Sequence, residues 1–405
     1  MTIEIRRATP EDMQQFGSLT EYVYAGAYGF GEDNLTTQAN QPEWLLCAFD
    51  GSKLVASYGT IPFTMRANGN AMALGGVTTV GTLPEYRRRG LQRTLTEKAF
   101  AQQHEAGAAV TALWASQAAI YQRYGYCAGS VQGNYSIDTV DINLLQPPDP
   151  GLSVTRCSLA DGFEDIRQIY REFVSNRFLY LHRSKPLWNN NTLNTDQNSG
   201  PVHTAICRNS AGEGVGYVVY TLNSNKVTHR ARAQEIEIRD LTWLDIDVCR
   251  ALWAFLARHD LVGRVVWHKV PLDDPTPELL MEPRLLHAQH TEGVWFRVVD
   301  VARALTERGY CADGEIVLGV TADRLSPWNE GAYHLSVADG VAEVTKTSRT
   351  AEITFPIKSL ASAFCGYRRV AQLAHWGLLD GEASATARAD SLFATIQAPH
   401  CPDNF

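Results

Sequence analysis

An arginine-rich turn between a predicted strand and a predicted helix constrains this chain more than any other stretch. Residues 75–83, GGVTTVGTL, have the β-branched composition of a strand. After them, Leu91, Leu95 and Ala99 recur at the spacing of a helix that begins near Gly90. The turn itself reads RRRG at 87–90. Because a helix start presents unpaired N–H groups and a positive dipole end, and glycine allows close approach, the turn predicts a pyrophosphate-binding loop.

This loop belongs to neither of the two common nucleotide-binding types. The chain contains no Gly-x-x-x-x-Gly-Lys-Ser/Thr sequence, which a P-loop requires, and no Gly-x-Gly-x-x-Gly sequence, which a Rossmann loop requires. Taken alone, the turn also fits a solvated basic patch at a helix start, and that alternative stays open.

The composition limits the class of the chain and its partners. At 405 residues the chain exceeds the ~250 to 300 residues at which single cores stop growing, so we expect more than one domain. The net charge of −8 gives no general attraction to nucleic acid or anionic membranes and favours a cationic small molecule. No apolar stretch reaches the ~18 residues of a membrane helix, so we expect a cytoplasmic protein. The eight cysteines form no CxxC pair, and we expect no metal site.

The order of predicted elements recurs along the chain. A strand, a helix, a hairpin that turns at Asp50-Gly51, and a strand followed by a helix and a strand precede the proline-rich linker at 146–151. The same order recurs in weaker form between 152 and 288, which predicts an internal duplication. From about residue 291 the pattern changes to a third α/β body. We therefore expect three domains, at 1–146, 147–288 and 289–405.

Two stretches carry a resemblance to a known family. TVGTLPEYRRRGLQR (79–93) and ASQAAIY (115–121) resemble the Gcn5-related N-acetyltransferase (GNAT) superfamily and, within it, the Eis (enhanced intracellular survival) acetyltransferases of actinobacteria. The resemblance covers the full length and implies an α/β fold, with tandem GNAT domains followed by a sterol-carrier-protein-like domain. The second GNAT-like domain is expected not to bind CoA, because DLTWLDIDVCRALW (240–253) has no arginine-glycine loop between strand and helix.

The resemblance also assigns roles to matching positions. The cofactor-binding residues that it implies are Val80, Gly81, Thr82, Arg88, Arg89, Gly90, Leu91, Gln92, Arg93, Ser116 and Gln117. The backbone of 80–82 is expected to bind the pantetheine arm and residues 88–93 the pyrophosphate, while Ser116 and Gln117 flank the cofactor. Gln92 stands where the superfamily prefers a small residue.

Two further positions have implied catalytic roles. Tyr121 is the implied general acid that protonates the departing CoA thiolate, although a buried core tyrosine also fits the sequence. The α-carboxylate of the last residue, Phe405, is the implied general base. Without the resemblance, a frayed chain end is the expectation there.

The implied activity is acetyl-CoA-dependent N-acetylation of primary amines by direct transfer in a ternary complex. Family members accept aminoglycoside antibiotics and lysine-type amines, and polyamines offer similar groups. Because residues 22–31 contain no carboxylate, acceptance of aminoglycosides stays open. The resemblance implies a homohexamer built from two trimers. Two alternatives remain: a longer-chain N-acyltransferase, and a lipid-binding or scaffold protein that uses the sterol-carrier-like domain beside a relic GNAT domain.

Overall fold

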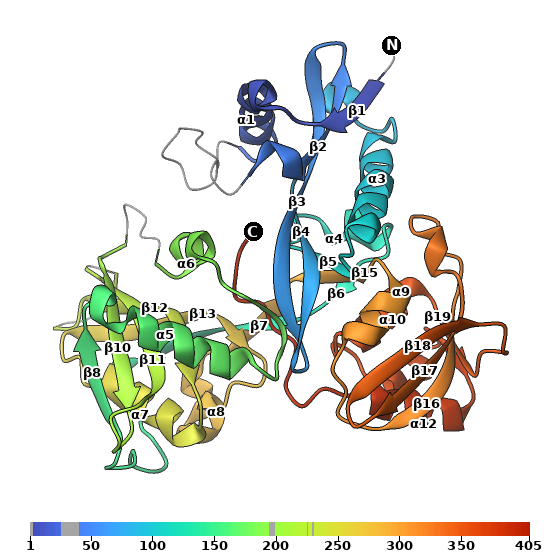
Figure 1. The fold of residues 1–405 in the computed structure, drawn as a ribbon. Helices are drawn as coiled ribbons and strands as arrows, with labels where there is room; N and C mark the ends of the chain where they lie inside the picture. Colours follow the sequence, from blue (N-terminus) through green and yellow to red (C-terminus); the bar gives the residue numbers. More distant parts are fainter. Residues whose placement is uncertain (1–2, 26–39, 194–198, 225, 229–230) are drawn as a thin grey trace. The chain divides into compact units, whose positions relative to one another are not determined.

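The computed structural model describes residues 3–25, 40–193, 199–224, 226–228 and 231–405, and the chain divides into two compact units (Figure 1). The first unit contains Met1–Ser130, Phe178–His182 and Val294–Phe405, and the second contains Val131–Arg177 and Arg183–Gly293. Each unit combines sheets with helices, which agrees with the predicted α/β class. No helix within the described ranges is long and apolar enough to cross a membrane.

The first sheet of the first unit has the strand order β1-β2-β3-β4-β5-β15-β6, with β9 paired to β3. Its strands are β1 (Ile3–Arg7), β2 (Leu45–Asp50), β3 (Lys53–Ala67), β4 (Asn70–Thr82), β5 (Val110–Leu113), β6 (Cys127–Ala128), β9 (Phe178–Leu181) and β15 (Trp295–Val298). Only β4 and β5 run parallel in this sheet as described; the other pairs are antiparallel. The parallel pair is the part of this sheet that matters most for the site.

Among the described residues, the helices α1 (Met13–Val23), α3 (Leu91–Glu105) and α4 (Ala118–Gln122) accompany this sheet. The predicted helix near Gly90 is confirmed, and its expected apolar stripe, Leu91, Leu95 and Ala99, is buried. Phe100 joins that stripe in the core under α3. The stripe fixes α3 against β3 and β4 and so fixes where the arginine-rich turn lies.

Two hairpins build the centre of the sheet. The expected turn after β2 is confirmed: Asp50 pairs with Lys53, and Gly51 has φ +62°. A second turn at Asn68-Gly69, with φ +52° and +98°, connects β3 to β4. β4 therefore begins at Asn70, five residues before the predicted strand. Asn-Gly is the dipeptide most typical of such two-residue turns, so the chain carries a local signal for this hairpin that strand composition alone does not show.

The second unit contains the sheet β14-β7-β13-β12-β11-β10-β8, in which β12 and β13 are parallel. Its strands are β7 (Val131–Asp138), β8 (Ser153–Cys157), β10 (Val202–Arg208), β11 (Gly214–Asn223), β12 (Gln234–Trp243), β13 (Val262–Pro271) and β14 (Gln289–Glu292). Its helices are α5 (Leu159–Val174), α6 (Lys185–Asn191), α7 (Ile246–Ala257) and α8 (Thr276–Leu279). The strand, helix, hairpin, strand, helix and strand of the predicted duplication all recur here.

A second, five-stranded sheet in the first unit has the order β18-β17-β16-β19-β20. Its strands are β16 (Gly314–Val320), β17 (Gly331–Ala338), β18 (Val341–Thr347), β19 (Ile353–Phe355) and β20 (Asp380–Gly381). The helices around it are α9 (Val301–Glu307), α10 (Ile357–Phe364), α11 (Val370–His375) and α12 (Ala383–Leu392). This sheet corresponds to the third α/β body expected from the sequence.

Two strands lie in sheets other than those that the sequence predicted. β7 was expected in the first body but belongs to the second sheet, where it pairs with β13. β15 was expected in the third body but lies between β5 and β6. The physical reason is that β6 has only two residues, so β15 supplies the backbone partners that the edge of β5 needs. The domain boundaries after residues 146 and 288 do not coincide with these units and stay a prediction.

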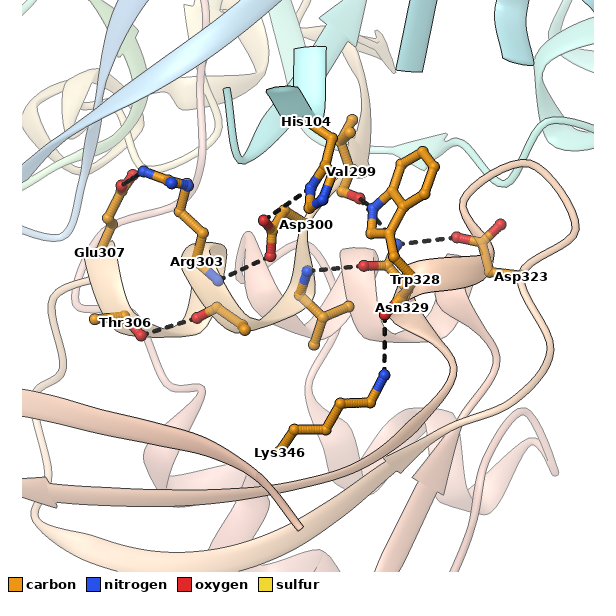
Figure 2. A network of polar contacts seen from close by, with 12 residues as sticks. His104, Val299, Asp300, Arg303, Thr306, Glu307, Asp323, Trp328, Asn329 and Lys346 are labelled. Carbon is orange, nitrogen blue, oxygen red and sulfur yellow. Dashed lines mark hydrogen bonds and ion pairs between the residues drawn. The ribbon is translucent and has the colours of Figure 1, made fainter. Parts of the chain in front are cut away.

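Polar contacts join α3 to the start of the third body within the first unit (Figure 2). His104, near the end of α3, lies with Nδ1 3.0 Å from Oδ2 of Asp300. Its ring stacks on Trp328 with centroids 4.6 Å apart, and the Trp328 indole donates to the Val299 carbonyl at 2.8 Å. Because the helix that follows the arginine-rich turn is held at its far end as well, its position does not depend on the turn alone.

Candidate active site

The parallel strands β4 and β5 separate after a short paired stretch. Val77 pairs with Leu113, where β5 ends, whereas β4 continues along β3 to Thr82. Within the described chain, no strand pairs with the outer edge of residues 78–82. Two parallel strands that part in this way leave backbone N–H and C=O groups available for a ligand, because such groups require partners.

A bulge in β4 lies at the point of separation. The register with β3 moves from Gly59↔Thr78 to Ser57↔Gly81, and Thr79 between them has φ +50°. The Ser57 hydroxyl donates to the Thr79 carbonyl at 2.6 Å. A Cβ at Gly59 would lie 2.7 Å from the Thr79 hydroxyl oxygen, so glycine makes room for the bulge. Bulges re-aim the strand that follows, here residues 80–82.

The arginine-rich turn follows β4 and starts α3. Gly90 is the N-cap with φ +80°, Arg88 has φ +62°, and no side chain caps the helix. The first N–H groups from Leu91 onward therefore have no partner within the helix. The side chains of Arg88, Arg89 and Arg93 are exposed. An uncapped helix start with exposed cations has the polarity that a pyrophosphate requires.

The arginine side chains of the turn differ in their hydrogen-bond and ion-pair partners. Arg89 donates to the Glu85 carbonyl at 2.7 Å, and Arg93 pairs with Glu97 at 2.9 Å. Arg88 has no side-chain partner among the residues that the structure describes. Exposed pairs of this kind contribute little and can exchange for a phosphate contact. All three cations are thus available to an anion at the turn.

Gln92 has a structural role that the sequence did not reveal. Its amide donates to the carbonyl of Gly81 at 2.6 Å, to that of Ser57 at 3.1 Å, and to the Thr82 hydroxyl at 3.0 Å. The residue thus braces α3 against β3 and β4. Leu91 is buried in the core, so only its backbone faces the turn. At this position, where the superfamily prefers a small residue, Gln92 links α3 to β3 and β4 by hydrogen bonds.

Tyr121 lies in the short helix α4 that follows β5 and is 6% exposed. Burial raises the pKa of its hydroxyl above the ordinary value, and a hydrogen bond with Ser116 opposes that shift. Ser116 itself and Gln117, the N-cap of α4, are exposed. A phenol with a raised pKa is protonated at neutral pH and can donate a proton or a hydrogen bond.

A neighbouring tyrosine, Tyr126, packs within the core. It is 1% exposed, and burial raises its pKa to about 12. Its ring meets that of Tyr121 edge to face with centroids 6.0 Å apart, and its hydroxyl lies 3.4 Å from the Thr111 hydroxyl and 3.5 Å from that of Tyr58. These contacts give Tyr126 a packing role in the core.

The C-terminal tail lies against the sheet where β4 and β5 separate. The Trp114 indole, directly after β5, donates to the carbonyl of Asp403 at 2.9 Å. The Phe405 ring lies 5.1 Å from that of Phe63, and a Cβ on Gly76 would come within 3.0 Å of it. Gly76 is opposite Ala112, one residue before β5 ends. The last residue therefore packs on the sheet near the separated strands, in place of a frayed end.

Residues 26–31, part of the stretch whose lack of a carboxylate leaves aminoglycoside acceptance open, lie outside the described residues. Glu32 and Asp33, the first carboxylates after that stretch, lie outside them as well, so acceptance of aminoglycosides stays a prediction. Tyr24, just before that region, donates from its hydroxyl to the Val80 carbonyl at 3.1 Å. The described start of this segment is thus tied to the β4 residues at the site.

Three stretches of the chain match models of known families. Residues 4–129 match a model described as an acetyltransferase (GNAT) domain, and residues 179–299 match a second model of that description. Residues 301–402 match a sterol carrier protein domain. The three matches follow the order in which the bodies were predicted, and they confirm the tandem GNAT domains and the sterol-carrier-like domain.

Similar proteins decide the family. An uncharacterised N-acetyltransferase of Streptomyces avermitilis is 30% identical over 389 residues, covering 90% of this chain and 89% of that protein. The N-acetyltransferase Eis of Mycobacterium tuberculosis is 27% identical over 329 residues, covering 79% of this chain and 78% of that protein. The chain belongs to the Eis family of GNAT N-acetyltransferases. It is therefore an acyltransferase, and its GNAT domains imply acetyl-CoA as co-substrate.

Solved structures share the Eis-family fold over the full length of the chain. Eis1 from Mycobacterium abscessus has a TM-score of 0.83 at 24% identity, and a GCN5-related N-acetyltransferase from Anabaena variabilis has a TM-score of 0.87 at 23% identity. Each comparison covers 100% of both chains. At these identities the likeness concerns the fold, and it supports the predicted class.

The second GNAT domain of this Eis-family chain starts its corresponding helix differently. α7 follows β12, and its N-cap is Asp245, whose carboxylate accepts from the Val248 N–H at 2.9 Å. Where Gly90 leaves the start of α3 open to an anion, the Asp245 carboxylate occupies the start of α7, and Asp247, which pairs with Arg250, adds a second carboxylate beside it. This contrast favours the prediction that only the first GNAT domain binds CoA.

Proposed function

We propose that this protein transfers the acetyl group of acetyl-CoA to a primary amine of a small molecule, directly within a ternary complex. One observation carries the proposal. The open edge of β4, the uncapped start of α3, Tyr121 and the C-terminal Phe405 all belong to one compact unit and gather around the separation of β4 and β5.

The co-substrate follows from this arrangement. The pantetheine arm would pair with the backbone of Val80, Gly81 and Thr82 along the open edge of β4. The pyrophosphate would lie at the start of α3, held by N–H groups of residues 88–93 and by the side chains of Arg88, Arg89 and Arg93. Ser116 and Gln117, exposed after β5, would flank the thioester end.

The chemistry is acyl transfer, in which the amine loses one proton and the departing thiolate finally gains one. The amine nitrogen forms a bond to the thioester carbon, and the carbon–sulfur bond then breaks with its electron pair leaving on sulfur. The carboxylate of Phe405 accepts the proton that the amine loses, directly or through a water. The N–H of Val80 would stabilise the oxyanion that forms on the carbonyl oxygen.

Tyr121 would act on the leaving group. A thiol has a reference pKa near ~8.5, and burial holds the pKa of Tyr121 above that of an ordinary phenol. Full proton transfer to the thiolate is therefore uphill. Hydrogen-bond donation while the carbon–sulfur bond breaks is the larger part of the expected contribution, and CoA leaves as a thiol after exchange with solvent.

The net charge of −8 supports cationic acceptors, which include aminoglycosides, lysine-type amines and polyamines. We further propose a cytoplasmic homohexamer of two trimers, by analogy with the family. Sedimentation of the untagged protein tests the assembly.

The activity is tested by thiol release from acetyl-CoA across a panel of aminoglycosides, polyamines and lysine peptides. We expect amine-dependent release with at least one class. Preference for long-chain acyl-CoA would instead identify an N-acyltransferase. Bound lipid, with no affinity for acetyl-CoA and no release, would identify a lipid-binding or scaffold protein.

A further inference from the structure

The C-terminal tail, residues 393–405, is held by hydrogen bonds where it begins and again at His400. Arg308 is fully buried and donates to the carbonyls of residues 392–394 at 2.8 to 3.3 Å, where α12 ends and the tail begins. Further along, the His400 N–H donates to the Phe178 carbonyl in β9 at 3.0 Å. The ring of His400 lies 5.5 Å from that of Tyr180. These contacts fix the approach of the tail but not the direction of its last residues.

Contacts at Asp403 and at Phe405 hold the last residues, and the Cys401 Sγ also lies 3.6 Å from the Asp403 carbonyl. The Trp114 indole N–H donates to the carbonyl of Asp403 at 2.9 Å, and the Phe405 ring packs against Phe63 and close to Gly76. Asn404 between these points is exposed. A backbone oxygen held two residues before the end, together with an anchored terminal ring, leaves the α-carboxylate little freedom to turn.

Trp114 lies where it can set the position of the Phe405 carboxylate. It directly follows β5, a strand paired with β4 on one side and with β15 on the other. Its indole therefore moves with the centre of the sheet, at the end of β5 where the two strands separate. The Asp403 carbonyl comes from a position 289 residues later in the chain, so local sequence does not impose the contact.

We propose that Trp114 is a positioning residue for acetyl transfer: its indole N–H holds the Asp403 carbonyl and thereby sets where the Phe405 carboxylate lies. The inference rests on the proposed function, in which that carboxylate accepts the proton of the amine. Trp114 touches neither reacting atom in this role. Its effect on turnover passes through the tail alone.

The test compares two substitutions that remove the same kind of bond. Trp114→Phe keeps an aromatic ring and loses the N–H. Trp328→Phe is the matched control, because the Trp328 indole also donates to a backbone carbonyl, that of Val299 at 2.8 Å, which lies outside the tail (Figure 2). Both variants are first checked for wild-type melting behaviour and oligomer size.

We expect Trp114→Phe to lower kcat about tenfold, the range of one hydrogen bond, with unchanged KM for acetyl-CoA. Trp328→Phe should keep the wild-type kcat. In a variant that ends at Pro402 the carbonyl of Asp403 is missing, so adding Trp114→Phe there should cause no further loss. A purely structural role would lower kcat in both backgrounds and would overturn the proposal.

A second readout does not depend on activity. Carboxypeptidase A removes an aromatic C-terminal residue, and we expect it to release Phe405 several times faster from Trp114→Phe than from the wild type or Trp328→Phe. Equal release rates overturn the proposal. If the wild type acetylates no amine, the proposed function fails, yet the release rates still decide whether Trp114 holds the tail. Faster release with unchanged kcat rejects the positioning role while acetyl transfer stands.

Discussion

Gly90 holds a backbone conformation that other residues adopt only with strain. Its φ is +80°, and a Cβ at this position would meet no atom within 4 Å. The requirement for glycine therefore comes from the backbone angle, since there is room for a side chain. From the sequence, glycine was expected for close approach to the ligand, and the structure adds the turn itself as a reason.

Gly90→Val should weaken acetyl-CoA binding at least tenfold, about 1.4 kcal/mol, because the first N–H groups of α3 lose their direction. Isothermal calorimetry measures the change. Gly212→Val is the matched control: Gly212 has φ +84° with no atom within 4 Å of a Cβ, in the β10–β11 hairpin. The control should lose stability and keep its affinity. Unchanged affinity in a folded Gly90→Val protein would move the pyrophosphate site elsewhere.

Tyr121→Phe should lower kcat by about 10- to 100-fold, the range of one hydrogen bond to a charged group, with little change in acetyl-CoA affinity. The reason is that the hydroxyl acts only as the thiolate leaves. Tyr126→Phe removes a hydroxyl of the neighbouring core tyrosine and should keep most of the turnover. Steady-state kinetics and calorimetry on both variants check the pair. The reverse pattern would assign the proton donor to Tyr126.

Asp274 in the second unit gives a prediction on pH. Burial raises the pKa of its carboxyl to about 7, against ~3.9 for an unfolded chain. Between about pH 4 and 7 the folded protein keeps a proton that the unfolded chain has lost, so the unfolding free energy falls as the pH rises through this window. Asp274→Asn should remove that fall. Urea unfolding at pH 5 and pH 8 measures it, and parallel profiles for the two proteins would contradict the assignment.

At the scale of elements, the junction of α3 with β4 depends on Gln92. Its amide is the donor in three contacts with β3 and β4, two of them to backbone carbonyls. Gln92→Ala should therefore lower the unfolding free energy by ~1 to 3 kcal/mol. Gln102→Ala, on the same helix, should stay within ~0.5 kcal/mol of the wild type. Denaturant unfolding measures both, and equal losses would mean that the brace contributes little.

Elements with a strong local pattern were predicted well, and pairing between distant strands was not. The stripe of Leu91, Leu95 and Ala99 identified α3, because apolar residues four apart lie on one face of a helix and would not share a buried face in an irregular loop. β15 was assigned to the wrong body, since its four residues carry no sign of which sheet they join. Strand pairing depends on which edge is open, and that is known only once the rest of the sheet exists.

At the scale of the whole molecule, the candidate site combines residues that no local pattern brings together. The turn at Gly90 could be predicted from the sequence because strand, glycine and helix are adjacent. The contacts of Phe405 with Phe63 and of Asp403 with Trp114 join distant parts of the chain. Only the family resemblance pointed to the C-terminus, because composition and spacing say nothing of where a terminal segment packs.

The sharpest consequence of this arrangement concerns the end of the chain. If the Phe405 carboxylate accepts the proton, adding two residues after it converts the anion into an amide and moves the new carboxylate away from the amine. We expect turnover to fall 10²-fold or more, the contribution of a general base, while melting temperature and acetyl-CoA affinity persist. Phe405→Ala should cause a smaller loss, because it keeps the carboxylate and removes only the ring that packs on Phe63 and Gly76. The same two residues added at the N-terminus serve as the control. Wild-type turnover in the C-terminally extended protein would assign the proton to a side chain or to water.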